Sequence, residues 1–117
     1  MLGDFNKLGK THSHRPSVHI PVVIKGPGVK AGRTSRELVE LQDLNATILD
    51  YCNLNMPEAE DFRSLRPLLS GENITHRSYQ VSAFKGWKMI SDGKYKLVVR
   101  EEGKEELYNQ RKDPWEE

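Results

Sequence analysis

The sequence predicts a mixed α/β chain whose last third is an antiparallel β-meander. Three observations support this fold class. A β-branched run at residues 20–24 ends at Gly-Pro-Gly, apolar residues recur at helical spacing over residues 43–52, and two alternating runs flank Asp92-Gly93. The first pattern is typical of a buried strand, the second of a helix and the third of a hairpin.

Composition limits the classes of function. The chain has 117 residues, 36% hydrophobic and 30% charged, which fits one small domain or a piece of a larger protein. Its 18 basic and 17 acidic residues are interspersed, so no nucleic-acid footprint is predicted. No apolar run reaches membrane-spanning length, so no membrane partner is predicted either. Cys52 is the single cysteine, which excludes an intramolecular disulfide, and we expect a buried core thiol.

The first two thirds of the chain should contain one loop, one strand and two helical segments. Residues 1–19 are polar and predict a loop, whereas residues 20–24 predict a strand that is apolar on both faces. Such a strand normally lies inside a sheet covered on both sides, and this chain is too short to supply that sheet.

A helix is predicted from Asp43, a good N-cap, to about Cys52. Its buried stripe would be formed by Leu44, Ile48 and Cys52. Residues 57–62 are acidic and predict a loop. Residues 64–69 predict a short helical turn that ends at Gly71.

The C-terminal third should be a meander. Asp92-Gly93 between two alternating runs predicts a type I′ hairpin, because both turn residues of that type need positive φ. A further strand is predicted at residues 106–108. Alternation places Tyr95, Leu97 and Val99 on one face and Lys94, Lys96 and Val98 on the other. We interpret the lysines, together with Arg100, as a solvated strand face.

Five consecutive stretches resemble the sulfatase branch of the alkaline-phosphatase-like superfamily, in the order that this family uses. Each motif is weak alone, but the ordered set covers nearly the whole chain. The stretches are residues 1–10 (MLGDFNKLGK), 17–29 (SVHIPVVIKGPGV), 39–50 (VELQDLNATILD), 64–71 (SLRPLLSG) and 106–116 (ELYNQRKDPWE).

This resemblance implies the C-terminal fragment of an alkaline-phosphatase-like sulfatase fold. Residues 1–76 would be the end of the catalytic domain and residues 77–117 a small antiparallel subdomain. The intact parent would be a sulfuric ester hydrolase that depends on calcium and formylglycine. Its substrate would be a sulfated sugar or aryl alcohol. The sequence itself does not indicate a compartment, and the resemblance suggests a periplasmic or secreted parent.

The sequence lacks the family's nucleophile motif, Cys/Ser-x-Pro/Ala-x-Arg. In the family, the calcium ligands lie N-terminal to the segment that residues 1–10 resemble. We therefore expect no cofactor in this chain and no activity from it alone. Its partner would be the missing N-terminal catalytic portion. Apolar surface left uncovered by that portion predicts a homo-oligomer.

Two side chains are candidates for the site of the parent enzyme. Lys10 corresponds to the family lysine in Gly-Asp-x-x-x-x-Gly-Lys, which the resemblance makes a catalytic contact to the sulfate and the leaving group. The resemblance also makes His14 a candidate for substrate binding, because family members often place substrate-facing side chains just after that lysine. His12 and His14 form His-x-His, but a zinc site needs a third ligand, so no metal site is predicted.

Two other readings remain open. The parent could be a sister hydrolase that acts on phosphodiesters or phosphonates, because the lysine and the metal chemistry are shared. The chain could also be an independent, non-catalytic interaction module.

Overall fold

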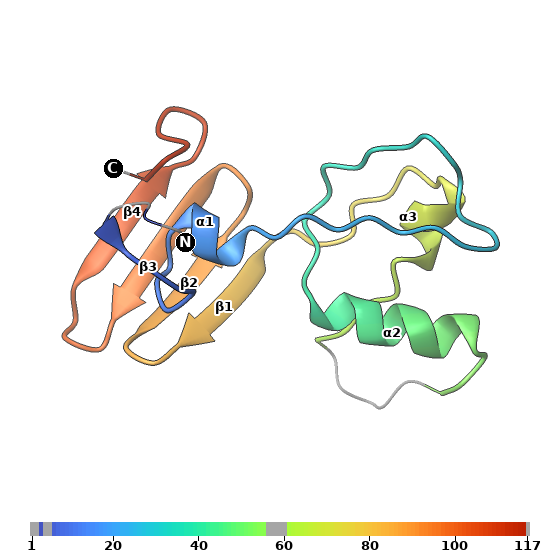
Figure 1. The fold of residues 1–117 in the computed structure, drawn as a ribbon, viewed down its shortest axis with the longest axis horizontal. Helices are drawn as coiled ribbons and strands as arrows, with labels where there is room; N and C mark the ends of the chain where they lie inside the picture. Colours follow the sequence, from blue (N-terminus) through green and yellow to red (C-terminus); the bar gives the residue numbers. More distant parts are fainter. Residues whose placement is uncertain (1–2, 4–5, 56–60, 117) are drawn as a thin grey trace. The chain divides into compact units, whose positions relative to one another are not determined.

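The computed structural model describes residues 3, 6–55 and 61–116. Contacts within the chain define two compact units, and Figure 1 shows their elements. The first unit, here called the β unit, comprises Met1–Val22 and Tyr79–Glu117; the second, the α unit, comprises Val23–Ser78. The domains expected from the resemblance, residues 1–76 and 77–117, concern the larger enzyme and stay a prediction. No helix in the described part of the chain is long and apolar enough to cross a membrane.

Four antiparallel strands form the sheet of the β unit, in the order β1-β2-β3-β4 (Figure 1). Each strand pairs with the next along the chain, which confirms the predicted meander and the mixed α/β class. The strands are β1 (Gln80–Phe84), β2 (Trp87–Ser91), β3 (Tyr95–Arg100) and β4 (Glu105–Asn109).

The hairpin between β2 and β3 was correctly predicted, but its turn type was not. Gly93 has a φ of 81°, whereas Asp92 is not among the residues with positive φ. The Asp92 side chain instead accepts hydrogen bonds from the backbone N–H groups of Lys94 (2.8 Å) and Tyr95 (2.6 Å). Side-chain bonding of this kind closes the turn without the second positive φ of type I′.

The two faces of the sheet differ in burial. One face holds the core residues Trp87, Met89 and Val98, with Tyr108 packed against them. The predicted alternation along β3 is correct, but the lysine at its centre is not solvated: Lys96 is 1% exposed and lies on the core face with Val98. The opposite face carries exposed apolar side chains from all four strands: Val81, Ile90, Tyr95, Val99 and Leu107.

The α unit contains α2 (Gln42–Tyr51) and α3 (Arg66–Ser70). Both confirm predicted helical segments, and α3 ends as expected at Gly71 in the left-handed conformation (φ 97°). Of the predicted loop at 57–62, residues 57–60 lie outside the described part of the chain.

The start and the buried face of α2 differ from the prediction. Its N-cap is Leu41, and Asp43 lies in the first turn. Buried positions are Asp43, Ala46 and Thr47, so a more polar face is covered. The predicted apolar stripe is wrong, because Ile48 is 62% exposed and Cys52 is exposed as well. Hydrogen bonding explains why this face of α2 is buried. Thr47 accepts a bond from the Leu65 backbone N–H, and Asp43 accepts bonds from the backbone N–H groups of Glu40 and Arg63. Apolar side chains could not make these contacts.

Two predictions for the N-terminal third were wrong. Residues 20–24 form no strand and have no ladder partner in the described chain; Val23 is 94% exposed. An apolar run becomes a strand only where another strand accepts its backbone hydrogen bonds. Within the predicted loop at 1–19, residues Arg15–Val18 form a short helix, α1, started by Pro16 in its first turn.

Candidate functional site

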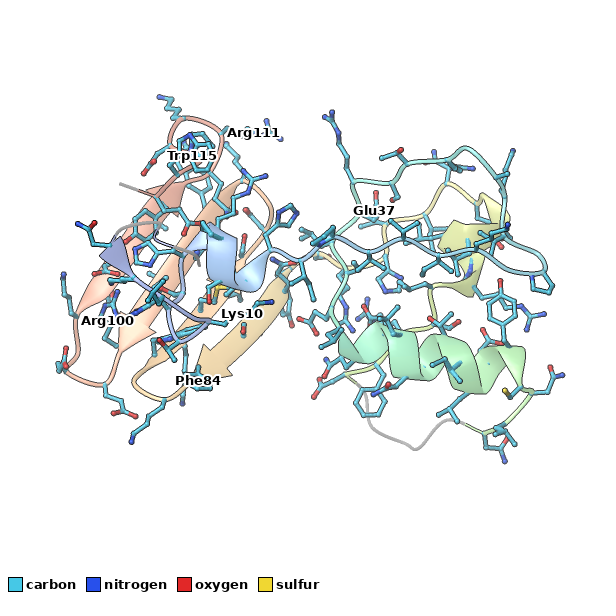
Figure 2. All side chains as sticks on the ribbon, in the orientation of Figure 1. Lys10, Glu37, Phe84, Arg100, Arg111 and Trp115 are labelled. Atoms are coloured by element: carbon cyan, nitrogen blue, oxygen red, sulfur yellow. The ribbon has the colours of Figure 1, made fainter. Side chains whose placement is uncertain are left out.

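Lys10 is exposed and belongs to the β unit (Figure 2). It follows Gly9, which has a φ of 83°. Its ammonium makes no hydrogen bond or ion pair to any described residue, so the cation is available to a ligand. Residues 10–15, here called the Lys10 loop, carry both predicted site residues, Lys10 and His14.

Three backbone groups of the Lys10 loop are held by the β unit. The Trp87 indole Nε1 donates to the Thr11 carbonyl at 2.9 Å. The Lys96 Nζ donates to the Ser13 carbonyl. The Arg15 N–H donates to the Glu116 carboxylate at 2.9 Å. Because these bonds hold alternate residues, the backbone on both sides of His14 is anchored while the Lys10 side chain stays in solvent.

The His12 and His14 rings meet edge to face, with centroids 6.3 Å apart. Burial, followed by the charge of Lys7, lowers the pKa of each ring below the ordinary 6.5. Both rings are therefore mainly neutral at pH 7, and a neutral imidazole can donate and accept hydrogen bonds. No group of three or more metal-ligating side chains occurs among residues 3, 6–55 and 61–116.

The α unit contains a buried carboxylate that sequence reasoning placed at a helix cap. Asp43 is completely buried and accepts hydrogen bonds from the backbone of Glu40 (2.9 Å) and Arg63 (3.0 Å), from His76 Nε2 (3.1 Å) and from the Arg77 guanidinium. Burial alone would raise the pKa of Asp43, but Arg77, with the other donors, lowers it to about 2. Because its carboxylate is occupied by donors from Glu40, Arg63, His76 and Arg77, we interpret Asp43 as a residue that stabilises the fold of the α unit.

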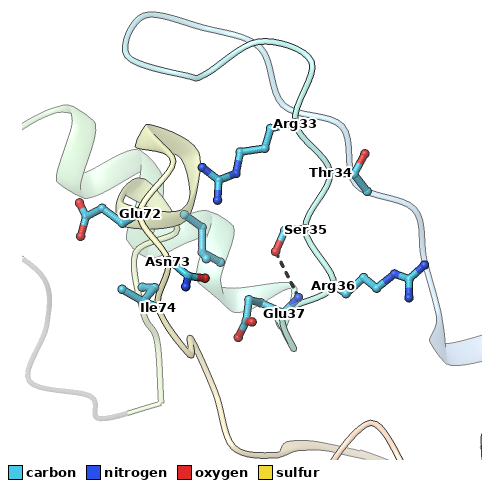
Figure 3. A pocket seen from close by; sticks show the side chains of 9 residues that line it. Arg33, Thr34, Ser35, Arg36, Glu37, Glu72, Asn73 and Ile74 are labelled. Atoms are coloured by element: carbon cyan, nitrogen blue, oxygen red, sulfur yellow. Dashed lines mark hydrogen bonds between the residues drawn. The ribbon is translucent and has the colours of Figure 1, made fainter.

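An open, mainly polar pocket lies elsewhere in the α unit (Figure 3). Two of its polar groups serve the backbone: Arg33 donates to the Gly71 carbonyl, and the Ser35 hydroxyl accepts from the Glu37 N–H at 3.1 Å. None of the predicted site residues contributes to it. The pocket is lined by Arg33, Thr34, Ser35, Arg36, Glu37, Leu68, Glu72, Asn73 and Ile74.

The anchoring roles of three side chains, Trp87, Lys96 and Glu116, are not predicted from the sequence. One signal was present, because alternation had already placed Lys96 on the same face as the apolar Val98. No sequence signal identifies Glu116 as its partner, since the two residues are brought together only by the folding of the C-terminal segment onto the sheet.

Comparisons with known proteins show that the chain is similar to sulfatases. The family model for N-sulphoglucosamine sulphohydrolase, C-terminal, matches residues 3–117. An arylsulfatase of Clostridium perfringens is 32% identical over 83 residues, covering 68% of this chain and 17% of the relative. Human N-acetylglucosamine-6-sulfatase is 33% identical over 81 residues, covering 68% of this chain and 15% of the relative.

A solved structure has a similar fold. The chain aligns with a 2-O GAG sulfatase at a TM-score of 0.62 and 29% identity, over 76% of this chain and 22% of the other. The chain thus spans less than a quarter of the length of each of these relatives.

Proposed function

The chain belongs to the sulfatase family, as a C-terminal portion of the N-sulphoglucosamine sulphohydrolase type, and on this premise we propose that the complete protein hydrolyses a sulfate ester on a sugar. The observation that carries the proposal is the family match over residues 3–117, which includes Lys10 and the loop that follows it. The names of one relative, an N-acetylglucosamine-6-sulfatase, and of the matching family model, N-sulphoglucosamine sulphohydrolase, add support for an amino sugar.

Lys10 would act by electrostatic stabilisation. Hydrolysis breaks the bond between sulfur and the ester oxygen, and negative charge develops on that oxygen as the sugar leaves. An ammonium is a compact charge with three donors, which suits contact with a sulfate oxygen or the leaving oxygen. An exposed Lys10 at the start of an anchored loop supports this role, because the backbone beside it is fixed while its side chain remains free.

His14 would contact the sugar. Its ring is mainly neutral at pH 7, because burial lowers its pKa. A neutral imidazole is better suited to a sugar hydroxyl, with which it can exchange hydrogen bonds, than to the charge of a sulfate. We therefore assign His14 to substrate binding and Lys10 to the reacting group.

Calcium and formylglycine are proposed for the complete enzyme and not for this chain. The described residues form no cluster that could hold calcium, and the sequence has no Cys/Ser-x-Pro/Ala-x-Arg motif. No catalytic step of either group can be assigned to residues of this chain. We therefore propose that the 117-residue chain alone hydrolyses no sulfate ester.

The test is Lys10→Ala in a full-length sulfatase that carries this chain, assayed with an O-sulfated glucosamine. Loss of one charge-stabilising donor should lower kcat about 100-fold or more, without a change in melting temperature. Lys85→Ala is the matched control, because Lys85 is another exposed lysine of the β unit and should leave the rate unchanged.

Three outcomes would revise the proposal. An unchanged rate in a stable Lys10→Ala variant removes Lys10 from the active site. Faster turnover of a phosphodiester or phosphonate ester than of any sulfate ester assigns the protein to the sister hydrolases. Partner binding by the isolated chain, with no turnover in any longer form of the protein, supports an interaction module.

A further inference from the structure

A buried ion pair on the core face of the sheet has no part in the proposed sulfate chemistry. Lys96 of β3 and Glu116 of the C-terminal segment approach within 2.5 Å, and each side chain is 1% exposed. Neither can reach solvent or an incoming substrate. Any role of Lys96 and Glu116 must therefore come from the groups that they contact within the β unit.

Each member of the pair also makes one hydrogen bond to the backbone of the Lys10 loop. Lys96 Nζ donates to the Ser13 carbonyl, and Glu116 Oε2 accepts from the Arg15 N–H at 2.9 Å. The pair thus bonds the backbone on both sides of His14. Together with the Trp87 bond to Thr11, it holds the segment that follows Lys10.

The C-terminal segment is arranged to deliver the Glu116 carboxylate inward. Glu116 has a φ of 63°, a left-handed conformation that is unfavourable for a residue with a Cβ. Its N–H donates to Asp113 at 2.8 Å, and its second carboxylate oxygen accepts from Gln110 at 3.2 Å. Gln110 in turn accepts from the Ser91 hydroxyl at 2.8 Å. A strained residue held at several points indicates that the position of its carboxylate matters.

Stability alone is a poor explanation for such a pair. Apolar side chains of similar volume often replace a buried ion pair without loss of stability. They could fill the space of Lys96 and Glu116, but they could not bond to the Ser13 carbonyl or the Arg15 N–H. The feature that distinguishes the ion pair from apolar packing is its contact with the Lys10 loop.

We propose that Lys96 and Glu116 are positioning residues that hold the Lys10 loop in the conformation needed to present Lys10 and His14 to the substrate. This inference rests on the proposed function for its catalytic consequence. The structural part, fixation of the loop by the pair, stands independently of it.

The experiment compares two double variants with the unchanged chain. Lys96→Met/Glu116→Met removes both charges and the two bonds that the pair makes to the loop, while keeping side-chain volume and the Trp87 bond to Thr11. Lys96→Met/Glu116→Gln also removes the charges but keeps an oxygen that can accept from the Arg15 N–H. Amide hydrogen exchange of Arg15 is measured by NMR in the 117-residue chain, and kcat and KM are measured in a full-length sulfatase carrying it.

With the bonds to the loop lost, exchange at Arg15 should be about tenfold faster in the double Met variant at a melting temperature near that of the unchanged chain. Its kcat should fall about tenfold, because a misplaced Lys10 slows the chemical step, and its KM should rise, because His14 is no longer held in place to contact the sugar. Lys96→Met/Glu116→Gln should recover most of the protection of the Arg15 amide. Its kcat should lie between that of the double Met variant and that of the unchanged protein. Arg66→Met, which breaks an exposed ion pair of the α unit, is the control and should change none of these quantities.

Wild-type exchange and wild-type kcat in the double Met variant would overturn the proposal and make the pair a packing feature. If that variant does not fold, the Glu116→Gln combination decides, and an unchanged kcat in it has the same meaning. If the full-length protein lacks sulfatase activity even without substitution, the proposed function fails, whereas the exchange measurement still tests whether the pair fixes the loop.

Discussion

The two units of this protein bury charge in different ways. In the α unit, Asp43 is surrounded by backbone and side-chain donors, and these outweigh burial to lower its pKa to about 2. In the β unit, Lys96 has one carboxylate and one carbonyl partner, and burial lowers the pKa of its ammonium despite Glu116. The charged form of Asp43 is therefore favoured by Arg77 together with several further donors, whereas Glu116 does not fully offset the effect of burial on Lys96.

The origin of the partners also differs. The donors to Asp43 come from residues 40–77 and join successive segments of the α unit. The partners of Lys96 come from the two ends of the chain, at Ser13 and Glu116. We therefore expect loss of Asp43 to unfold its unit, whereas loss of the Lys96 pair should act mainly on a loop.

The largest expected effect is that of Asp43→Ala. It leaves the Arg77 guanidinium and the N–H groups of Glu40 and Arg63 without their acceptor in a buried place. The free energy of unfolding should fall by about 3–5 kcal/mol, the range found when one member of a buried charged pair is removed. Urea denaturation followed by circular dichroism measures this. Asp50→Ala, at the partly exposed pair with Arg66, should cost less than about 1 kcal/mol. An equal loss of unfolding free energy in Asp43→Ala and Asp50→Ala would contradict a special structural role for Asp43.

Acid should remove part of the Asp43 contribution. The folded-state pKa of Asp43 is about 2 against an ordinary value of 3.8, so its stabilisation is complete above pH 3.8 and is lost as the pH falls toward about 2. We expect the destabilisation by Asp43→Asn to be about 2 kcal/mol smaller near pH 2 than at pH 7. Denaturation of both proteins at the two pH values gives this difference directly. If Asp43→Asn destabilises the protein equally at pH 2 and pH 7, the charge of Asp43 contributes nothing to the free energy of unfolding.

The smallest effect concerns self-association, which the sequence predicted. Apolar side chains are exposed on α2 of the α unit, including Ile48, and on the open sheet face of the β unit, including Ile90. If α2 carries the association, Ile48→Lys should weaken it by about 1 kcal/mol, and Ile90→Lys should have no effect. Light scattering at micromolar concentration of the chain and of both variants separates the two surfaces. A monomeric mass for the unchanged chain would refute the predicted homo-oligomer.

Local patterns in the sequence determined most of the regular structure. The hairpin around Asp92-Gly93, the α2 segment and the end of α3 at Gly71 all depend on neighbouring residues, because alternation, helical spacing and a left-handed glycine act over a few positions. The ordered motifs also identified the family, and with it Lys10 as the candidate catalytic residue.

Only the tertiary structure decided which side chains are buried and what holds the Lys10 loop. Lys96 is buried because the C-terminal segment folds back and supplies Glu116, a contact that no local pattern around residue 96 contains. Ile48 and residues 20–23 include apolar side chains typical of a core, but they are exposed in the described structure. Burial is a property of what packs against a side chain, so hydrophobic periodicity predicts an element and its faces but not which face the rest of the protein will cover.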